Sequence, residues 1–254
     1  MAQLSRSGRR TFLTVVALLV SAACFAQADY AREKRWADEI TPGLVVGDAV
    51  YLAQKSGHKF LAIYTAGAPA SAAVITVHGS GVHPDWALIG ALRSGLADQG
   101  YTTLSVQMPV LAATAKGEEY LPLFPDAAER LRAAVAFLKA KGHRKIAIAS
   151  HSLGARMSNL FLAGTPDHDI AAWISVGITT GEFTEPDRLR MPVLDIYGER
   201  DFPQVLQHAS ARAAVLKTLK GSAQIEVAGA DHFFAGHEAE LVRQVKQFLD
   251  LRLK

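Results

Sequence analysis

The stretch "IAIASHSLG", residues 146–154, decides how the chain is interpreted. Its four apolar residues are typical of a buried strand, and they end abruptly at Ser150-His151-Ser152, after which a helical pattern begins. A serine at a sharp strand-to-helix turn is the nucleophile elbow of the motif G-x-S-x-G. Here Ser150 occupies the first glycine position. Ser152 is therefore either the nucleophile of a hydrolase or a small residue in a turn.

A nucleophilic serine needs a histidine to remove its proton and a carboxylate to orient that histidine. In enzymes with such a nucleophile elbow, the acid follows the serine and the histidine follows the acid. Asp201 lies just after the apolar run 193–197 and a glycine turn. His232 follows the apolar run that ends at Val227. Both lie where predicted parallel strands end and loops converge, so we predict Ser152 as nucleophile, His232 as base and Asp201 as orienting acid.

Other acidic residues and histidines compete for these roles. Glu199 is the nearest alternative acid, whereas Asp195 lies inside the predicted strand and Asp231 adjoins the candidate base. Asp201 has a second possible role as the cap of a helix that begins near Pro203. Three further histidines follow the serine and fit the role of base less well. His168 lies in a predicted loop, His208 within a predicted helix and His237 in the first turn of another.

Acyl transfer also needs N–H groups that stabilise the negative charge on the carbonyl oxygen. Leu153 supplies one of them at the start of the predicted helix, where the helix dipole helps. The loop 78–81, His-Gly-Ser-Gly, follows the predicted strand 73–77 and supplies the other. We assign the oxyanion hole to Leu153, Ser80 and Gly79. The sequence has neither the metal motif H-E-x-x-H nor the phosphate loop G-x-x-x-x-G-K-[ST], and we expect no metal and no cofactor.

Apolar runs alternate with helical patterns after residue 28, which predicts an α/β domain with a mostly parallel sheet and helices on both faces. Strands are expected at 44–46, 60–64, 73–77, 102–106, 146–149, 171–176, 193–197 and 224–227, the first two antiparallel. Helices are expected from the Asp85 cap to Gly100, at 125–141, after the elbow, at 203–219 and at 237–251. The connection 177–191 is too short for a large cap domain.

The longest irregular connection covers residues 109–123. Loops of that length often border a site. Its Glu118, Glu119 and Tyr120 either touch a ligand or lie in a solvated loop.

Residues 1–28 have the three parts of a secretory signal peptide. Arginines precede the uncharged run 12–25, and Ala26-Gln27-Ala28 supplies a small-x-small cleavage site. The apolar run is too short to span a bilayer comfortably, although an uncleaved anchor is the alternative. We predict that residues 1–28 are removed and that 29–254 form one domain without a stable membrane span. Its expected location is the bacterial periplasm or the medium.

Two features bear on the export route. The sequence Gly8-Arg9-Arg10-Thr11-Phe12-Leu13 resembles a twin-arginine signal, but paired arginines also occur in general secretory signals. Ser21-Ala22-Ala23-Cys24 resembles a lipoprotein box that lacks the bulky aliphatic residue at its first position. Lipid attachment at Cys24 is therefore a minor alternative.

Charge and cysteine content both change when the leader is removed. The chain has a net charge of +3, and residues 1–28 hold three arginines and no acidic residue. The predicted domain is thus neutral, which excludes nucleic-acid binding through a basic face. The single cysteine is Cys24, so the domain contains no disulfide. We expect it to be held together by its apolar core.

The chain after residue 28 resembles the α/β-hydrolase superfamily. The stretches "VHGSGVHPDW", "LSVQMPVL", "LFPDAAERL" and "SHSLGARM" resemble a bacterial group of exported α/β-hydrolase-like proteins of unknown function. The resemblance implies a single-domain α/β-hydrolase fold with a Ser-Asp-His triad and implies no substrate. We expect a carboxylesterase-like serine hydrolase acting on an ester or thioester of a small substrate. The alternatives are an acyltransferase or peptidase with the same triad, and a non-catalytic binding module of the cell envelope.

Overall fold

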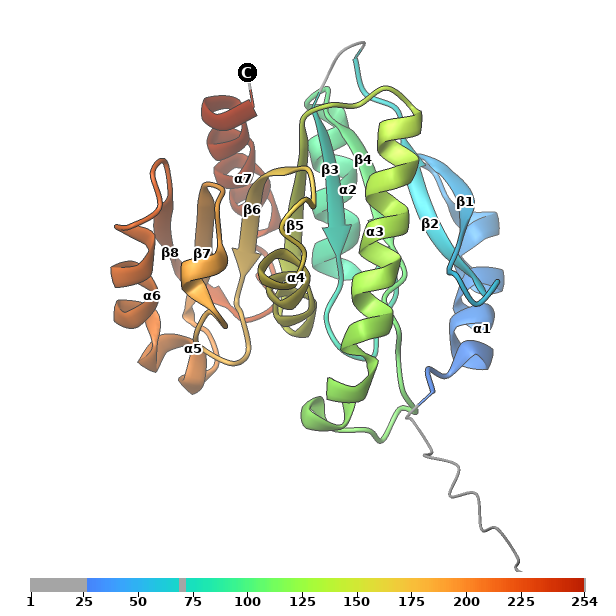
Figure 1. Ribbon diagram of the computed structural model, residues 1–254, viewed down its shortest axis with the longest axis horizontal. Coiled ribbons are helices and arrows are strands. Elements are labelled where there is room, and N and C mark those ends of the chain that lie inside the picture. The colour runs from blue at the N-terminus through green and yellow to red at the C-terminus, as the bar shows by residue number, and fades with distance from the viewer. Residues whose placement is uncertain (1–26, 69–71, 254) are drawn as a thin grey trace, which may run out of the picture.

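The computed structural model describes residues 27–68 and 72–253, which form one eight-stranded sheet with helices on both faces (Figure 1). The fold class predicted from the sequence is confirmed. The predictions for Cys24 and for residues 1–26 of the leader lie outside the described residues.

The sheet has the order β1-β2-β4-β3-β5-β6-β7-β8. β1 pairs with β2 and β2 with β4 in antiparallel fashion, and all other neighbours are parallel. The strands are β1 (Asp48–Ala53), β2 (Lys59–Thr65), β3 (Ala73–Val77), β4 (Thr102–Val106), β5 (Ile146–His151), β6 (Ile170–Val176), β7 (Val193–Arg200) and β8 (Ala223–Asp231).

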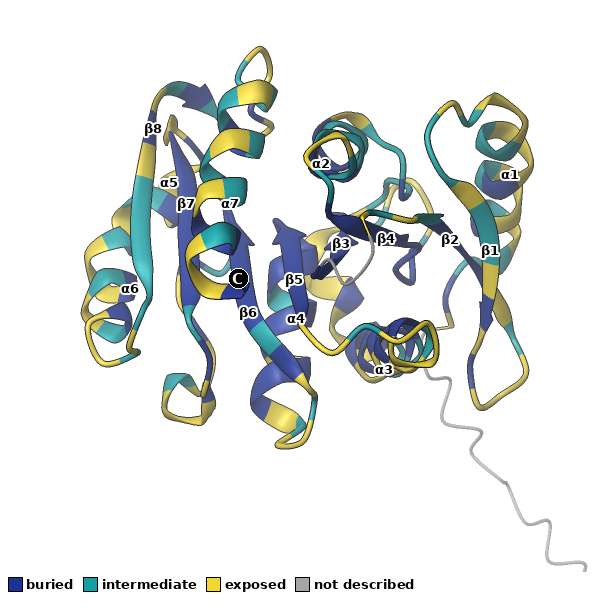
Figure 2. Cartoon of the chain, turned by 90° about the horizontal axis from the view of Figure 1, so that it is seen from above, coloured by how far each residue is buried: buried dark blue, intermediate teal, exposed yellow. Residues whose placement is uncertain are grey.

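The helices form a layer on each face of the sheet. α2 and α7 pack together on one face, and α3 and α4 pack together on the other (Figure 2). The α-helices are α1 (Tyr30–Ile40), α2 (Ala87–Asp98), α3 (Phe124–Ala140), α4 (Leu153–Gly164), α5 (Pro203–Gln207), α6 (Ala209–Leu216) and α7 (Glu238–Leu253). The 3-10 helices are η1 (Thr41–Gly43), η2 (Gly117–Leu123) and η3 (Pro186–Arg188).

The central strands are buried on both faces, which explains why they appear in the sequence as continuous apolar runs. Along β3, Ile75 belongs to the core cluster beneath α3 and α4, and its neighbour Val74 belongs to the cluster beneath α2 and α7. β3 and β5 pair in parallel from Ala73↔Ile146 to Val77↔Ser150. The loops that follow these two strands therefore emerge side by side.

One predicted strand and one predicted helix cap are wrong. Residues 44–46 form no strand, and the first strand is β1. Val45 is 95% exposed, so the apolar run there is a surface feature that precedes the turn at Gly47. Asp85 does not cap α2, whose N-cap is Trp86. The Asp85 carboxylate instead accepts a hydrogen bond of 2.7 Å from Nε of Arg93.

Three helical regions also differ from the predictions. The helix expected at 203–219 is two helices, α5 and α6, which meet at His208. At this point residues 204 and 208 lie close to Gly181, where a Cβ atom would not fit. The connection 109–123 contains η2 and is not wholly irregular. α1 was not predicted, although its N-cap Asp29 accepts a hydrogen bond from the N–H of Arg32 at 2.9 Å. α1 is polar overall and has few apolar residues, although these lie on one face of the helix.

The connection between β6 and β7 contains only the short helix η3 within the described chain, as expected for a fold without a large cap. Across residues 27–68 and 72–253, no helix has the length and apolar character needed to cross a membrane.

Candidate active site

Ser152 lies at the turn between β5 and α4 in a backbone conformation that non-glycine residues seldom adopt. Its φ is 59° and its ψ is −123°. The N–H of Ser152 donates to the carbonyl oxygen of Val176 at 2.9 Å, which ties the turn to the end of β6. Strained backbone of this kind gathers at functional sites, where the surrounding structure maintains it. The turn leaves Ser152 8% exposed.

Two glycines allow the elbow and the loop 78–81 to approach each other. A Cβ atom on Gly154 would lie 2.2 Å from the carbonyl oxygen of His78, so no side chain fits there. A Cβ atom on Gly79 would lie 3.1 Å from Cβ of Ser152 and 3.5 Å from its Oγ. The last glycine of the serine motif is therefore required by the packing, and Gly79 brings its loop against the serine.

Ser150, which replaces the first glycine of the motif, has a specific partner. Its Oγ accepts a hydrogen bond of 2.8 Å from Nε1 of Trp173 on β6. Both side chains are fully buried. An indole N–H can only donate and is costly to bury without an acceptor. The serine at this position therefore satisfies a tryptophan that a glycine would leave unpaired.

The structure brings Ser152, His232 and Asp201 together. His232 directly follows β8, and its Nε2 lies 3.0 Å from Oγ of Ser152. Its Nδ1 lies 2.6 Å from Oδ1 of Asp201, which also accepts a hydrogen bond of 2.7 Å from the N–H of Phe202. Because an ionised carboxylate only accepts, Nδ1 carries the proton and Nε2 is free to take one from the serine. His232 and Asp201 are 2% and 5% exposed.

The alternative acids lie elsewhere. Glu199 accepts a hydrogen bond from Gly229, and Asp195 forms a buried ion pair with Arg212 at 2.8 Å. Asp231 accepts from backbone N–H groups of its own turn. Asp201 does not cap α5, whose N-cap is Phe202. The other histidines after the serine also have partners away from it: His168 with Ile170, His208 with Glu182 and His237 with Ala235.

His151, beside the serine, supports the position of His232. Its Nε2 lies 2.9 Å from the backbone oxygen of His232, so Nε2 donates. The two rings lie 4.8 Å apart. Burial, followed in size by the nearby His232, lowers the pKa of His151 to about 3, so its ring stays neutral. No sequence signal predicts this contact, because the middle positions of the serine motif accept many residue types.

His78 orients the loop that faces the elbow. Its Nδ1 donates to the carbonyl oxygen of Gly79 at 2.8 Å, and its Nε2 accepts from the N–H of Met108 at 2.9 Å. Burial lowers the pKa of His78 to about 3. In a planar trans peptide the C=O and N–H point in opposite directions, so this bond turns the N–H of Ser80 away from the His78 ring. At the elbow, Leu153 is the first residue of α4, and its N–H has no acceptor within the helix.

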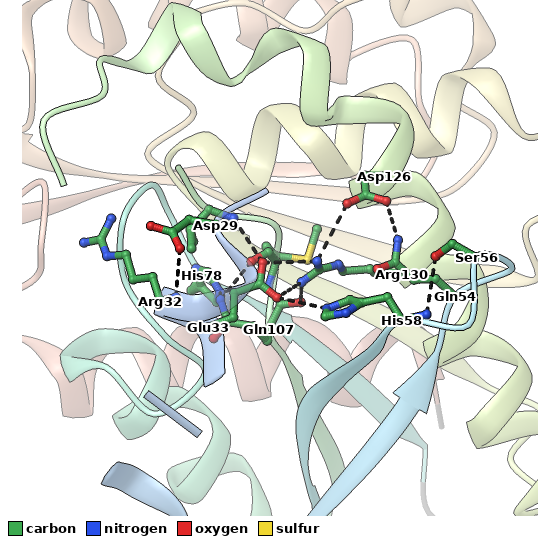
Figure 3. Close-up of polar contacts among 12 residues, drawn as sticks. Asp29, Arg32, Glu33, Gln54, Ser56, His58, His78, Gln107, Asp126 and Arg130 are labelled. Atoms are coloured by element: carbon green, nitrogen blue, oxygen red, sulfur yellow. Dashed lines mark hydrogen bonds and ion pairs between the residues drawn. The ribbon is translucent and has the colours of Figure 1, made fainter. Parts of the chain in front are cut away.

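A buried polar network connects His78 to α1 (Figure 3). Nε2 of His78 lies 3.1 Å from Nε2 of Gln107, and the carbonyl oxygen of Gln107 accepts from Arg130 at 3.0 Å. Arg130 is fully buried and also donates to Glu33 of α1 at 2.9 Å. Burial raises the pKa of the Glu33 carboxyl, an effect that the Arg130 guanidinium opposes.

The neighbouring residue on α1 holds the same region. Arg32 donates to the carbonyl oxygens of Gly81 at 3.0 Å and Leu111 at 2.6 Å. α1 therefore contacts both the loop 78–81 and the segment that follows β4. Sequence reasoning missed this role; the one available signal was the capping aspartate before a stretch with apolar residues at helical spacing.

The acidic residues of the 109–123 connection have structural partners. Glu118 forms an ion pair of 3.0 Å with Arg156 of α4. Glu119 accepts a hydrogen bond from Lys116 at the start of η2. Tyr120 is 2% exposed, and its hydroxyl accepts a hydrogen bond of 3.2 Å from the N–H of Leu111. In the described part of the chain, no group of three or more histidine, cysteine or acidic residues is arranged to hold a metal ion.

A family profile described as protein of unknown function (DUF3530) matches residues 14–121 and 125–251. The chain belongs to this family. The resemblance to a family of unknown function that the sequence suggested is thereby confirmed. None of the curated proteins matches this DUF3530 member.

Solved structures of α/β hydrolases are similar to this DUF3530 protein in fold. Dienelactone hydrolase from Anabaena variabilis has a TM-score of 0.65 and 19% identity, over 82% of this chain and 98% of that one. Est1E from Butyrivibrio proteoclasticus has a TM-score of 0.64 and 20% identity, over 82% and 99%. A serine hydrolase without lid from Xanthomonas campestris has a TM-score of 0.60 and 18% identity, over 82% and 95%. At these identities the similarity establishes the α/β-hydrolase fold.

Proposed function

We propose that this DUF3530 protein is an exported serine hydrolase that cleaves an ester or thioester of a small substrate. The observation that carries the proposal is the hydrogen-bonded series from Asp201 to His232 at 2.6 Å and from His232 to Ser152 at 3.0 Å. These are the distances at which a base can take a proton from a serine hydroxyl.

In the proposed reaction, Oγ of Ser152 attacks the substrate carbonyl while Nε2 of His232 takes its proton. Asp201 stabilises the imidazolium that forms. When the tetrahedral intermediate collapses, the bond to the leaving oxygen or sulfur breaks and His232 gives that atom its proton. A water molecule then attacks the acyl-enzyme, again with His232 as base, and releases the acid product and the free serine.

The oxyanion would be stabilised by the N–H groups of Leu153 and Ser80. Leu153 supplies a free N–H at the start of α4, and the hold of His78 on Gly79 turns the Ser80 N–H away from the imidazole. Gly79 contributes by lying against the serine. A donor aimed at such an oxyanion is worth about 3–4 kcal/mol of transition-state stabilisation.

The choice of an ester or thioester rests on the absence of a large cap between β6 and β7, because an uncovered site suits an accessible acyl group. The dienelactone hydrolase and the lidless serine hydrolase share this fold, which supports a hydrolytic role. The leader predicted at residues 1–28 supports a periplasmic or secreted location. Sequencing of the mature N-terminus tests that part, and we expect it to begin at Asp29.

Labelling with a fluorophosphonate probe tests the chemistry. We expect the folded wild-type protein to be labelled at Ser152 and to hydrolyse p-nitrophenyl esters or thioesters of short acyl groups. Ser152→Ala should lose both properties, with turnover reduced by about 10⁴-fold or more. Ser94→Ala, which removes a hydroxyl from α2, should keep both. An unlabelled Ser152 in the folded protein would instead favour the non-catalytic binding module.

A further inference from the structure

Three aromatic rings form a continuous cluster beside His232, which we call the aromatic rim: Phe202, Phe233 and Trp86. The Phe202 ring is stacked on the imidazole, with centroids 3.9 Å apart and planes 21° apart. Phe233 meets the imidazole edge-on at 5.1 Å and Phe202 at 6.0 Å. Trp86 meets Phe233 edge-on at 5.9 Å.

The aromatic rim is open to solvent although its rings are apolar. Phe202 is 38% exposed and Phe233 is 43% exposed. The three residues follow different strands, since Trp86 lies in the connection after β3, Phe202 after β7 and Phe233 after β8. They therefore gather at the same edge of the sheet as Ser152. Contiguous apolar surface next to such a serine is typical of a ligand contact.

The chemistry of the proposed reaction decides which part of a substrate meets the aromatic rim. Nε2 of His232 must give its proton to the leaving oxygen, so the alcohol portion lies against His232. The oxyanion lies instead against the N–H groups of Leu153 and Ser80. Phe202 and Phe233 both contact the His232 ring, so the rim adjoins the alcohol portion.

The ring faces of the rim are not occupied by a side-chain cation. In residues 27–68 and 72–253, no lysine or arginine lies over any of its three rings. Aromatic rings pair best when offset or edge-to-face, the arrangement that the rim residues already adopt among themselves. We propose that the aromatic rim binds the aromatic ring of an alcohol, so that the substrates are esters of aromatic alcohols. This inference rests on the proposed serine hydrolase activity.

The experiment compares three acetate esters, benzyl, cyclohexylmethyl and ethyl, in wild type and Phe233→Ala. Benzyl and cyclohexylmethyl alcohols have similar size and differ in aromaticity. We expect the wild type to have the highest kcat/KM for benzyl acetate. Phe233→Ala should lower kcat/KM for benzyl acetate about tenfold and change the value for ethyl acetate less than threefold. Leu121→Ala is the matched control, because Leu121 is 45% exposed on η2 and belongs to no ring contact of the rim.

Other outcomes overturn the inference in distinguishable ways. An equal loss for benzyl and cyclohexylmethyl acetate shows an apolar subsite without aromatic preference. Equal changes for benzyl and ethyl acetate, or no change at all, show that the rim does not contact the alcohol. If wild type is labelled at Ser152 by the fluorophosphonate but hydrolyses none of the three, the alcohol class is wrong and the serine hydrolase activity stands. If Ser152 is not labelled either, both proposals fail.

Discussion

At the scale of single residues, Ser150 shows how a departure from a common motif is accommodated. Ser150→Gly restores the usual glycine but leaves the buried indole N–H of Trp173 unpaired. We expect the free energy of unfolding to fall by about 1–3 kcal/mol, with ester turnover of the folded protein within a few-fold of wild type. Denaturant titration measures the loss. In a Trp173→Phe background the same substitution should cost clearly less, and an equal cost in both backgrounds would contradict the assigned contact.

Gly154 gives the opposite case, in which the motif residue is required. A Cβ there would lie 2.2 Å from the carbonyl oxygen of His78. Gly154→Ala should displace the loop 78–81 from the serine and lower kcat for an ester about a hundredfold, since a 1 Å misplacement can cost that much. Gly164→Ala, at the far end of α4, is the control because a Cβ there meets nothing within 4 Å. Equal activity of the two variants would show that the loop does not need this approach.

At the scale of elements, α1 is attached to the domain through a buried ion pair. Glu33→Gln removes the shorter of two ion pairs of the fully buried Arg130, at 2.9 Å, and leaves only the pair with Asp126 at 3.7 Å. Removing one partner of a buried pair costs about 3–5 kcal/mol, and we expect a loss of that size in the free energy of unfolding. Lys34→Gln, an exposed change on the same helix, should leave the free energy of unfolding nearly unchanged. Similar losses for both variants would mean that the Glu33–Arg130 pair does not anchor α1.

The elements that the sequence predicted well are those whose pattern is set by burial on both faces. β3 through β7 are buried along most of their length, and the elbow follows one of them. α1 and β1 escaped prediction because both lie at the exposed end of the sheet, where polar and apolar residues mix. The break at His208 was not predicted, and the residue that lies against it, Gly181, is distant in sequence.

The candidate site also has a part that the sequence predicts and a part that it does not. The positions of Ser152, Asp201 and His232 follow from chain order and strand ends, which a sequence displays. The contacts of three neighbouring residues could not be predicted in this way, because each joins segments that are distant in sequence. Ser150 contacts Trp173 on β6, His151 contacts the backbone of His232, and His78 contacts the segment after β4.

At the scale of the whole molecule, parallel strands collect the site at one edge. The loop 78–81 follows β3, Ser152 follows β5, Asp201 follows β7 and His232 follows β8. The same convergence buries two neutral histidines, His78 and His151, beside these groups. The fold that assembles the site therefore also makes its stability depend on pH.

The free energy of unfolding should fall in mild acid. Burial lowers the pKa of His151 from 6.5 to about 3, so the unfolded chain takes up a proton on this histidine that the folded chain refuses. The stabilisation is complete above pH 6.5 and is lost as the pH falls toward 3, by about 1.4 kcal/mol per pH unit. His151→Gln removes this titration and keeps a side-chain N–H for the backbone oxygen of His232. Denaturant titrations between about pH 5.5 and 4 should therefore give the variant a slope shallower than wild type by about 1.4 kcal/mol per pH unit. Parallel curves for the two proteins would show that His151 protonates equally well in the folded state.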